Sequence, residues 1–170
     1  MPPDLTGASV MVLPAQPAPG ESVLPDGEVV PGLDREIAFW LAEMTPQVHW
    51  VFPPAIERAL QRSPSLSIRL RSLAVAAFHR AQVENIGDPL FGDLRALAAL
   101  VDARFALIPV AAAWVPDTTG SGRIEMRVAL IDTRGGAVRW FGAVAGDPGR
   151  FDDPASVASA GRALGQLLAR

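Results

Sequence analysis

The sequence contains no cysteine, so the chain can form no disulfide, no thiolate metal site and no cysteine nucleophile. Lysine and tyrosine are also absent, and histidine occurs only twice. All 15 basic residues are therefore arginine, a bias that we attribute to a GC-rich bacterial genome rather than to phosphate binding. The net charge is −3 at pH 7, and this lack of a basic excess argues against a nucleic-acid-binding surface.

The sequence also lacks a long apolar run of the kind that crosses a membrane, which needs about 18 residues. Its first 16 residues have neither the charged start nor the apolar centre of a signal peptide. If Met1 is the native start, we expect a cytoplasmic protein; if the chain is a trimmed mature domain, this expectation does not hold. A hydrophobic content of 49% in 170 residues suits one domain with its own core.

The first half of the chain alternates between strand and helix patterns. A continuous apolar run that ends at Pro14 predicts a buried strand, and the proline- and glycine-rich residues 16–32 predict a long loop. Helical spacing of apolar residues, followed by proline, predicts the next helix, with two acidic residues in its first turn. The expected elements are a strand at 8–13, a helix at 33–44, a strand at 48–52 and a short helix at 54–62.

Residues 63–87 fit two patterns, a strand at 66–70 or a helix at 70–80, and the sequence does not choose between them. After them, Asp88 and Pro89 predict a helix start, with Asp88 as the cap and Pro89 in the first helical position. Pro109 predicts that the following strand is an edge strand or contains a bulge. The expected later elements are a helix from 90 to 101, strands at 105–115, 123–131 and 137–145, and a helix from 154 onward.

These elements predict a single α/β domain over residues 8–170, after a flexible start at residues 1–7. Its sheet should be mixed parallel and antiparallel, with helices packed on its faces. The last two strands should form an antiparallel hairpin through the "DTRGG" turn, followed by the final helix. Gly161 and Gly165, one turn apart on that helix, predict close packing of the helix on the sheet.

Few residues could carry chemistry. His49 alternates with apolar neighbours on a short strand, and His79 lies in the ambiguous segment, too loosely placed to define a site. The acids Asp88, Asp93 and Asp102 are explained by their positions at the ends of one helix. No metal-ligand spacing, phosphate-binding glycine loop or serine elbow is present. The sequence therefore predicts no catalytic residue, no cofactor and no metal site.

The hairpin offers one candidate partner surface, formed by Arg139, Trp140 and Phe141. Because side chains alternate along a strand, Trp140 and Phe141 should lie on opposite faces, and one of them should face away from the main core. An exposed aromatic ring beside arginine can mark a protein-binding surface. The alternative is that the proline-rich loop or a helix covers this ring.

The pattern resembles a group of bacterial envelope lipoprotein domains: the N-terminal domain of the translocation protein TolB, the curli-secretion lipoprotein CsgG and the penicillin-binding-protein activator LpoB. The similarity lies in "VMVLP", in "DLRALAALVDARFALIPVAAAW", in "RIEMRVALIDTRGGAVRWFG" and in the closing helix at 154–169. It covers most of residues 8–169. The shared positions are structural, so the resemblance transfers no functional residue; they are Leu13, Pro14, Leu130, Ile131, Asp132, Gly135 or Gly136, and Trp140.

The resemblance implies a mixed α/β domain with a non-enzymatic, protein-binding role in the periplasm, on a protein anchored to the outer membrane as a precursor. This chain lacks the lipidated cysteine of such lipoproteins, so an anchor would have to belong to a longer precursor. The loop at 16–32 and residues 63–87 also look longer than the usual connections of the group.

We therefore consider three functions. The first is a protein-binding or assembly module of the bacterial cell envelope, with an envelope protein as its partner. The second is a structural subunit of a homo-oligomer. The third is an enzyme that uses His49, His79 and the acids near Asp88.

Overall fold

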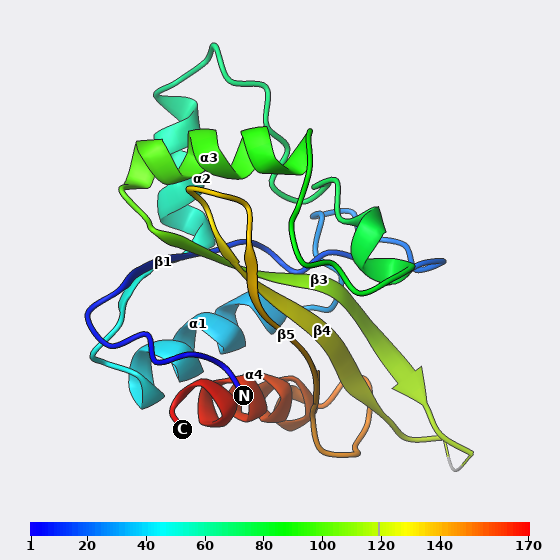
Figure 1. Ribbon diagram of the computed structural model, residues 1–170. Helices are drawn as coiled ribbons and strands as arrows, with labels where there is room; N and C mark the ends of the chain where they lie inside the picture. Colours follow the sequence, from blue (N-terminus) through cyan, green and yellow to red (C-terminus); the bar gives the residue numbers. More distant parts are fainter. Residues whose placement is uncertain (119) are drawn as a thin grey trace.

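The computed structural model describes residues 1–118 and 120–170 and shows one five-stranded sheet with helices on both of its faces (Figure 1). The strand order is β2-β1-β3-β4-β5. β1 runs parallel to both of its neighbours, whereas β3, β4 and β5 form an antiparallel meander, so the prediction of a mixed sheet is confirmed. The strands are β1 (Ser9–Val12), β2 (His49–Val51), β3 (Phe105–Pro116), β4 (Gly122–Asp132) and β5 (Val138–Ala145).

Two helical layers cover the sheet, as Figure 1 shows. The lower layer holds α1 (Leu33–Met44) and α4 (Pro154–Leu168). The upper layer holds α2 (Pro53–Gln61), α3 (Leu90–Val101) and the short 3₁₀ helix η1 (Ala76–His79). Each layer buries its own apolar core against the sheet, and we call these the α1/α4 core and the α2/α3 core.

β4 contributes to both cores because its side chains alternate between the two faces. Its even-numbered residues from Ile124 to Leu130 lie in the α1/α4 core, as the alternation predicts. Ala129 and Ile131 lie in the α2/α3 core. A strand that is buried on both faces lies inside a three-layer domain, and the sheet therefore leaves its edges, rather than its centre, for contact with other molecules.

Close packing at Gly161 and Gly165 is present, but against a helix and not against the sheet. A methyl group at Gly161 would lie 2.7 Å from the carbonyl oxygen of Glu36, and one at Gly165 would lie 3.0 Å from the carbonyl oxygen of Trp40. The two glycines therefore let the backbone of α4 approach the backbone of α1. The prediction of a helix–sheet contact was wrong because the sequence does not show which element faces the glycines.

β3 contains the bulge that Pro109 predicts, between Pro109 and Ala111, and it is a central strand rather than an edge. At this bulge, the residues after β1 form backbone hydrogen bonds to β3 on both sides of Val110. The amide of Gln16 donates to the carbonyl oxygen of Pro109 (2.9 Å), and the amide of Ala112 donates to the carbonyl oxygen of Gln16 (2.8 Å). The beginning of the proline-rich loop is thereby fixed along β3.

Residues 63–87 form neither of the two predicted elements; η1 is their only helix and they contain no strand. The segment is held in two ways: side chains of distant residues bond to its backbone, and its own side chains bond to the backbone of distant residues. The buried amide of Gln16 bonds the backbone of Leu70 and Leu73, and Nε2 of His79 donates to the carbonyl oxygen of Val110 (2.9 Å). Because single contacts fix this segment, its apolar residues follow no regular spacing. For this reason neither the strand pattern nor the helix pattern fitted the whole segment, and each fitted only a part of it.

The start of α3 differs slightly from the prediction. The Oδ1 of Asp88 accepts from the amide of Gly92 in the first turn (2.9 Å), but Asp88 lies one residue before the cap position, which Pro89 occupies. Pro89, however, lies just before the helix rather than in its first position. The predicted helix is confirmed, and its Leu90, Leu94 and Leu97 are buried in the α2/α3 core.

Candidate functional site

β5 is one of the two edge strands of the sheet, and its outer edge is the candidate site. The amide of Gly146 donates to the carbonyl oxygen of Ile124 (2.9 Å). With the register of the two strands, this bond shows which residues of β5 turn their N–H and C=O groups toward β4. In an antiparallel ladder such residues alternate with residues whose N–H and C=O groups point the other way. The register therefore turns the backbone groups of Phe141, Ala143 and Ala145 away from β4, toward the open side.

The chain covers only the beginning of this edge itself. The amide of Val138 donates to the carbonyl oxygen of Glu84 (2.8 Å), and the amide of Ile86 donates to the carbonyl oxygen of Gly136 (2.9 Å). Residues 84–86 thus pair antiparallel with the start of β5 through an isolated bridge between Asn85 and Ala137, without forming a strand. Beyond Val138, no described residue is paired with the outer side of β5.

A groove of about 570 Å³ opens where the chain leaves this edge. Residues 78–84 form one wall, and Arg127 and residues 138–141 form the other. At the base of the groove the ring of Phe78, which is buried, lies 5.5 Å from the ring of Phe141, centroid to centroid. The groove therefore has an apolar floor directly beside the open part of β5.

The rim of this groove is basic. Arg80, Arg127 and Arg139 are all exposed, and none of them forms an ion pair with another described residue. Glu84 is the one acidic residue in the described lining. The whole chain is slightly acidic, so this local excess of positive charge distinguishes the groove from the average surface.

The predicted partner surface lies on this edge, but its aromatic rings are not fully exposed. Trp140 and Phe141 lie on opposite faces, as expected, and each is half-buried against a core. The ring of Trp140 lies over Gly142, where a methyl group would overlap with it. Both rings are partly covered because helical layers flank both faces of the sheet, and the partner surface itself stays a prediction. Arg139 and the edge itself remain exposed.

The two histidines do not form a common site. His49 is exposed on β2, at the opposite edge of the sheet, and lies opposite Ser9. The positions of the two histidines can be compared along β3. Ser9, the partner of His49, bonds to the backbone of Arg104, whereas His79 bonds to Val110, which is six residues farther along the chain. At about 3.3 Å per residue this separates the two side chains by roughly 20 Å along the sheet, so they cannot act on one substrate atom.

The candidate acids are also explained by structure. Asp88 accepts a hydrogen bond from the first turn of α3, and Asp102 ends the helix in a left-handed conformation with φ of 53°. Burial raises the pKa of the Asp93 carboxyl above its ordinary value, and the negative charge of Asp88 adds to this rise. Within residues 1–118 and 120–170 there is no group of three or more potential metal ligands.

Asp34 has a structural role that the sequence did not predict. Its Oδ1 accepts from the amide of Ala15 (2.8 Å), and its Oδ2 accepts from Nη1 of Arg71 (3.0 Å). Burial nevertheless raises the pKa of the Asp34 carboxyl, outweighing the hydrogen bond from Ala15 and the charge of Arg71. The residue joins α1, the chain after β1 and the segment at 63–87.

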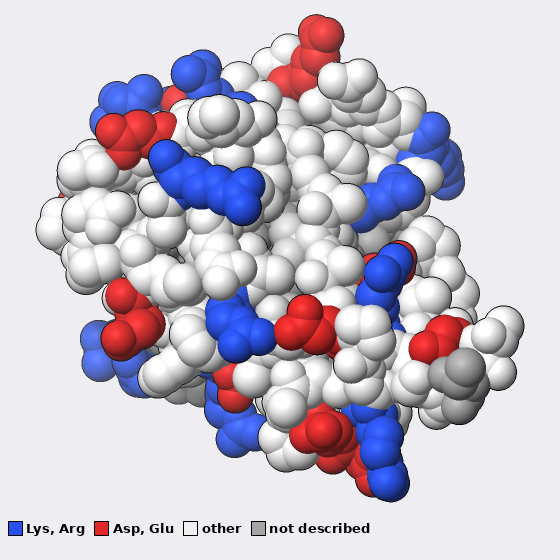
Figure 2. Space-filling model, turned by 90° about the horizontal axis from the view of Figure 1, so that it is seen from below, with Lys and Arg blue, Asp and Glu red and all other residues white. Residues whose placement is uncertain are grey.

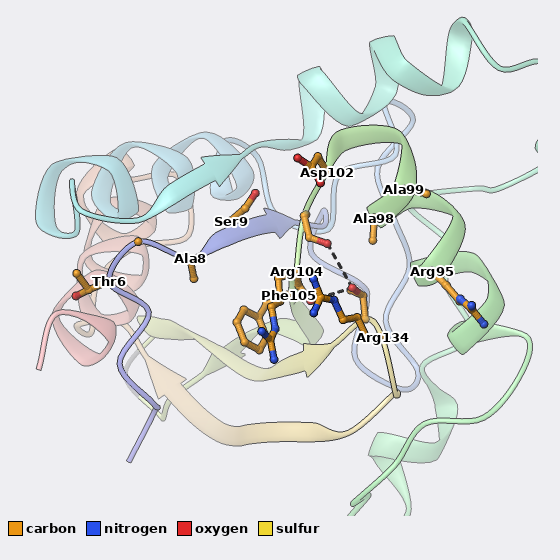
Figure 3. A pocket seen from close by; sticks show the side chains of 13 residues that line it. Thr6, Ala8, Ser9, Arg95, Ala98, Ala99, Asp102, Arg104, Phe105 and Arg134 are labelled. Carbon is orange, nitrogen blue, oxygen red and sulfur yellow. Dashed lines mark hydrogen bonds between the residues drawn. The ribbon is translucent and has the colours of Figure 1, made fainter.

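A second hollow, of about 660 Å³, lies at the end of the sheet where α3 joins β3 (Figure 3). Arg104 and Arg134 lie close together there, whereas Arg95 extends from α3 away from them. Arg104 already pairs with Asp132 (3.4 Å), and the hydroxyl of Thr133 donates to the carbonyl oxygen of Arg104 (2.8 Å). Arg104 and Thr133 are thus used by the fold, and because Arg95 points away, the polar groups of this hollow do not converge on one point.

The face covered by α1 and α4 carries acidic and basic side chains interspersed with uncharged ones (Figure 2). No single-sign field extends across this view, which agrees with the small net charge. In the part of the chain that the structure describes, no helix has the length and apolar character needed to cross a bilayer.

The groove depends on residues that sequence analysis missed. Arg80 belongs to the ambiguous segment, so its position next to the hairpin could not be expected. Arg127 is exposed on β4, opposite the apolar face of that strand, but the sequence does not show what lies beside it. Only the long-range pairing of residues 84–86 with the start of β5 brings these arginines together.

Comparisons with known proteins support the fold. No protein-family model matches the sequence, and no curated protein matches it. Lipoprotein GNA1162 from Neisseria meningitidis is similar in structure, with a TM-score of 0.53 and 14% identity over 95% of this chain and 98% of the other. A PelC dodecamer from Paraburkholderia phytofirmans has a TM-score of 0.50 and 17% identity, over 100% of this chain and 96% of the other.

The LpoB C-terminal domain from Escherichia coli is a weaker match, with a TM-score of 0.47 and 14% identity over 84% of each chain. The fold assignment therefore rests on the first two structures. The predicted resemblance is confirmed at the level of the fold, which this chain shares with a bacterial lipoprotein. The resemblance to the TolB and CsgG domains stays a prediction.

Proposed function

We propose that this chain is a non-enzymatic protein-binding or assembly module of the bacterial cell envelope. The observation that carries the proposal is the open edge of β5 beside a groove with an apolar floor and a basic rim. Such an edge can take an added strand, and a neighbouring groove can select its side chains. The fold shared with a lipoprotein over nearly the whole chain supports a location in the envelope.

Under this proposal the protein is periplasmic and is anchored to the outer membrane as a precursor. Its partner is an envelope protein, and it contacts the membrane only through an anchor outside this chain. Fractionation of cells that carry the gene at its own locus tests the location. We expect the protein in the periplasmic or membrane fraction, and recovery with the cytoplasmic markers would contradict the proposal.

Site-specific photocrosslinking tests the partner surface. A photoreactive phenylalanine analogue at position 139 lies on the edge of β5, and the same analogue at position 57, on an exposed part of α2, is the matched control. We expect a crosslinked envelope protein from position 139 and none from position 57. Equal crosslinking at both positions, or none at either, would mean that this edge is not the binding surface.

A homo-oligomer is the second candidate, favoured by the similarity in fold to PelC, which was crystallised as a dodecamer. In this case, subunits of the chain would be each other's partners. Analytical ultracentrifugation of the purified chain distinguishes this candidate from a module that binds a different protein. A strict monomer at high concentration would count against it.

A further inference from the structure

We propose that the open edge of β5 binds an extended, acidic segment of a partner protein by adding it to the sheet as a sixth strand. This inference rests on the proposed function and names the chemical class of the partner. It goes beyond a general binding surface because it specifies the conformation and the charge of what is bound.

The hydrogen-bonding groups of the edge set the conformation. The outward backbone groups of Phe141, Ala143 and Ala145 form a row that spans about 14 Å, since a strand rises about 3.4 Å per residue. Residues 84–86 already pair with the start of the same edge. The bulge in the pairing of β4 with β5, between Leu130 and Ile131, separates that occupied part from the open part.

The side chains along this edge leave room for another backbone. Gly142, Ala143 and Ala145 are small, and both alanines are exposed. Natural sheets protect open edges with charges, prolines or bulges that turn the edge away. Here the bulge and Arg139 lie at the start of the open part, and the rest of the edge has no such protection.

The charge of the rim selects the partner. Arg80, Arg127 and Arg139 carry three positive charges against the single negative charge of Glu84. An acidic segment complements this rim, and its attraction increases the rate of association. A second copy that paired edge to edge by twofold symmetry would place the same basic rim opposite itself, which costs free energy. The rim therefore favours an acidic partner strand over a second copy.

A peptide titration tests this proposal. The probe is a synthetic seven-residue peptide that alternates glutamate and valine, and the control peptide has lysine in place of glutamate. Each is added to the full chain labelled with ¹⁵N. We expect the amide resonances of Phe141, Ala143 and Ala145 to shift with the glutamate peptide, and binding of the lysine peptide to be at least about tenfold weaker.

Two variants separate backbone pairing from charge. Ala143→Pro removes an outward N–H but no bond to β4, so the fold should tolerate it, and we expect about tenfold weaker binding. Ala143→Thr keeps the N–H and is the matched control. Arg127→Glu should weaken binding of the glutamate peptide about fivefold and strengthen binding of the lysine peptide.

Three results would overturn the proposal: no shifts at the edge of β5, equal binding of both peptides, or unchanged binding by Ala143→Pro. It would also be overturned if sedimentation showed an oligomer that Ala143→Pro dissociates, because a second copy would then cover the edge. The proposed function is tested separately, since crosslinking from position 139 can succeed while both peptides fail to bind. In that case the module binds a partner that is not an acidic strand.

Discussion

Replacing Gln16 by alanine should destabilise the fold far more than its position in a loop suggests. The Gln16 side chain is almost completely buried, with 1% of its surface exposed. Its Nε2 donates to the carbonyl oxygens of Pro14 and Leu70 (both 2.8 Å), and its Oε1 accepts from the amide of Leu73 (3.0 Å). One amide group thus ties the segment at 63–87 to the end of β1.

The expected loss follows from these bonds. Each buried hydrogen bond contributes about 1 kcal/mol net, and a buried partner left without a bond costs about 1 to 3 kcal/mol. Gln16→Ala removes all three bonds and leaves the backbone groups of Leu70 and Leu73 without them. We therefore expect the free energy of unfolding to fall by about 3 to 5 kcal/mol, a large share of the roughly 5 to 15 kcal/mol typical of a domain.

Urea denaturation followed by circular dichroism measures this loss, with Gln47→Ala as the matched control. Gln47 is exposed, so its replacement should change the free energy of unfolding by less than about 0.5 kcal/mol. Amide hydrogen exchange shows where the loss acts, and we expect the Leu73 amide to exchange faster in Gln16→Ala. A loss below about 1 kcal/mol would refute the view that this amide fixes the segment.

Gln16→Glu is a sharper version of the same test. The carboxylate has nearly the shape of the amide but donates no hydrogen bond, and it would face the two carbonyl oxygens of Pro14 and Leu70. Burial would raise its pKa in the folded state, so its stability relative to the native protein should fall as the pH rises through that pKa. A variant whose stability difference from the native chain does not change with pH would contradict this placement.

Two further predictions concern the α1/α4 layer and the buried carboxylate. Gly161→Ala should lower the free energy of unfolding by about 1 to 2 kcal/mol in urea denaturation, since its methyl group would overlap with the backbone of Glu36. Gly92→Ala in α3 is the control and should cost less, because its methyl group would meet only the end of the Asp88 side chain (3.2 Å), which can move. Asp34→Asn should lose the pH dependence that Asp34 provides. Because burial raises the folded pKa of Asp34, its contribution is greatest below the ordinary value of 3.8 and falls as the pH rises through the folded value. The stability of the native chain relative to Asp34→Asn should thus decrease as the pH rises from the ordinary value of 3.8 through the raised pKa of the folded state, and an increase would mean that the ion pair with Arg71 dominates.

The sequence predicted the elements that bury a periodic apolar face. α1, α3 and β4 begin and end within a few residues of their expected limits, because each has a regular set of core positions. The hairpin of β4 and β5 was confirmed because its turn and its alternation are local signals. Local sequence patterns were sufficient for the helices and the hairpin, because the hydrogen bonds of these elements join residues that are close in the sequence.

The segment at 63–87 and the groove could not be predicted for the opposite reason. The segment takes its shape from single contacts with distant residues, such as Gln16 with Leu70 and His79 with Val110, and such contacts leave no period in the sequence. The predicted candidate surface of Arg139, Trp140 and Phe141 lies on β5, but its two rings are half-buried because a helical layer covers each face of the sheet. That this surface binds a partner stays a prediction. The edge, which depends on strand order, is visible only once the sheet is known.

The distribution of these contacts explains how β5 can have an open edge in a stable fold. Its own ladder with β4 and its aromatic side chains in both cores hold the strand from one side and from both faces. The contacts of Gln16 and Asp34 that fix the loops lie on the β1 side of β3 and do not involve the outer edge of β5. A strand added there would gain backbone bonds without displacing any that the fold uses. For this reason variants that block the edge, such as Ala143→Pro, should leave the free energy of unfolding nearly unchanged while they weaken binding, and variants of Gln16 should do the reverse.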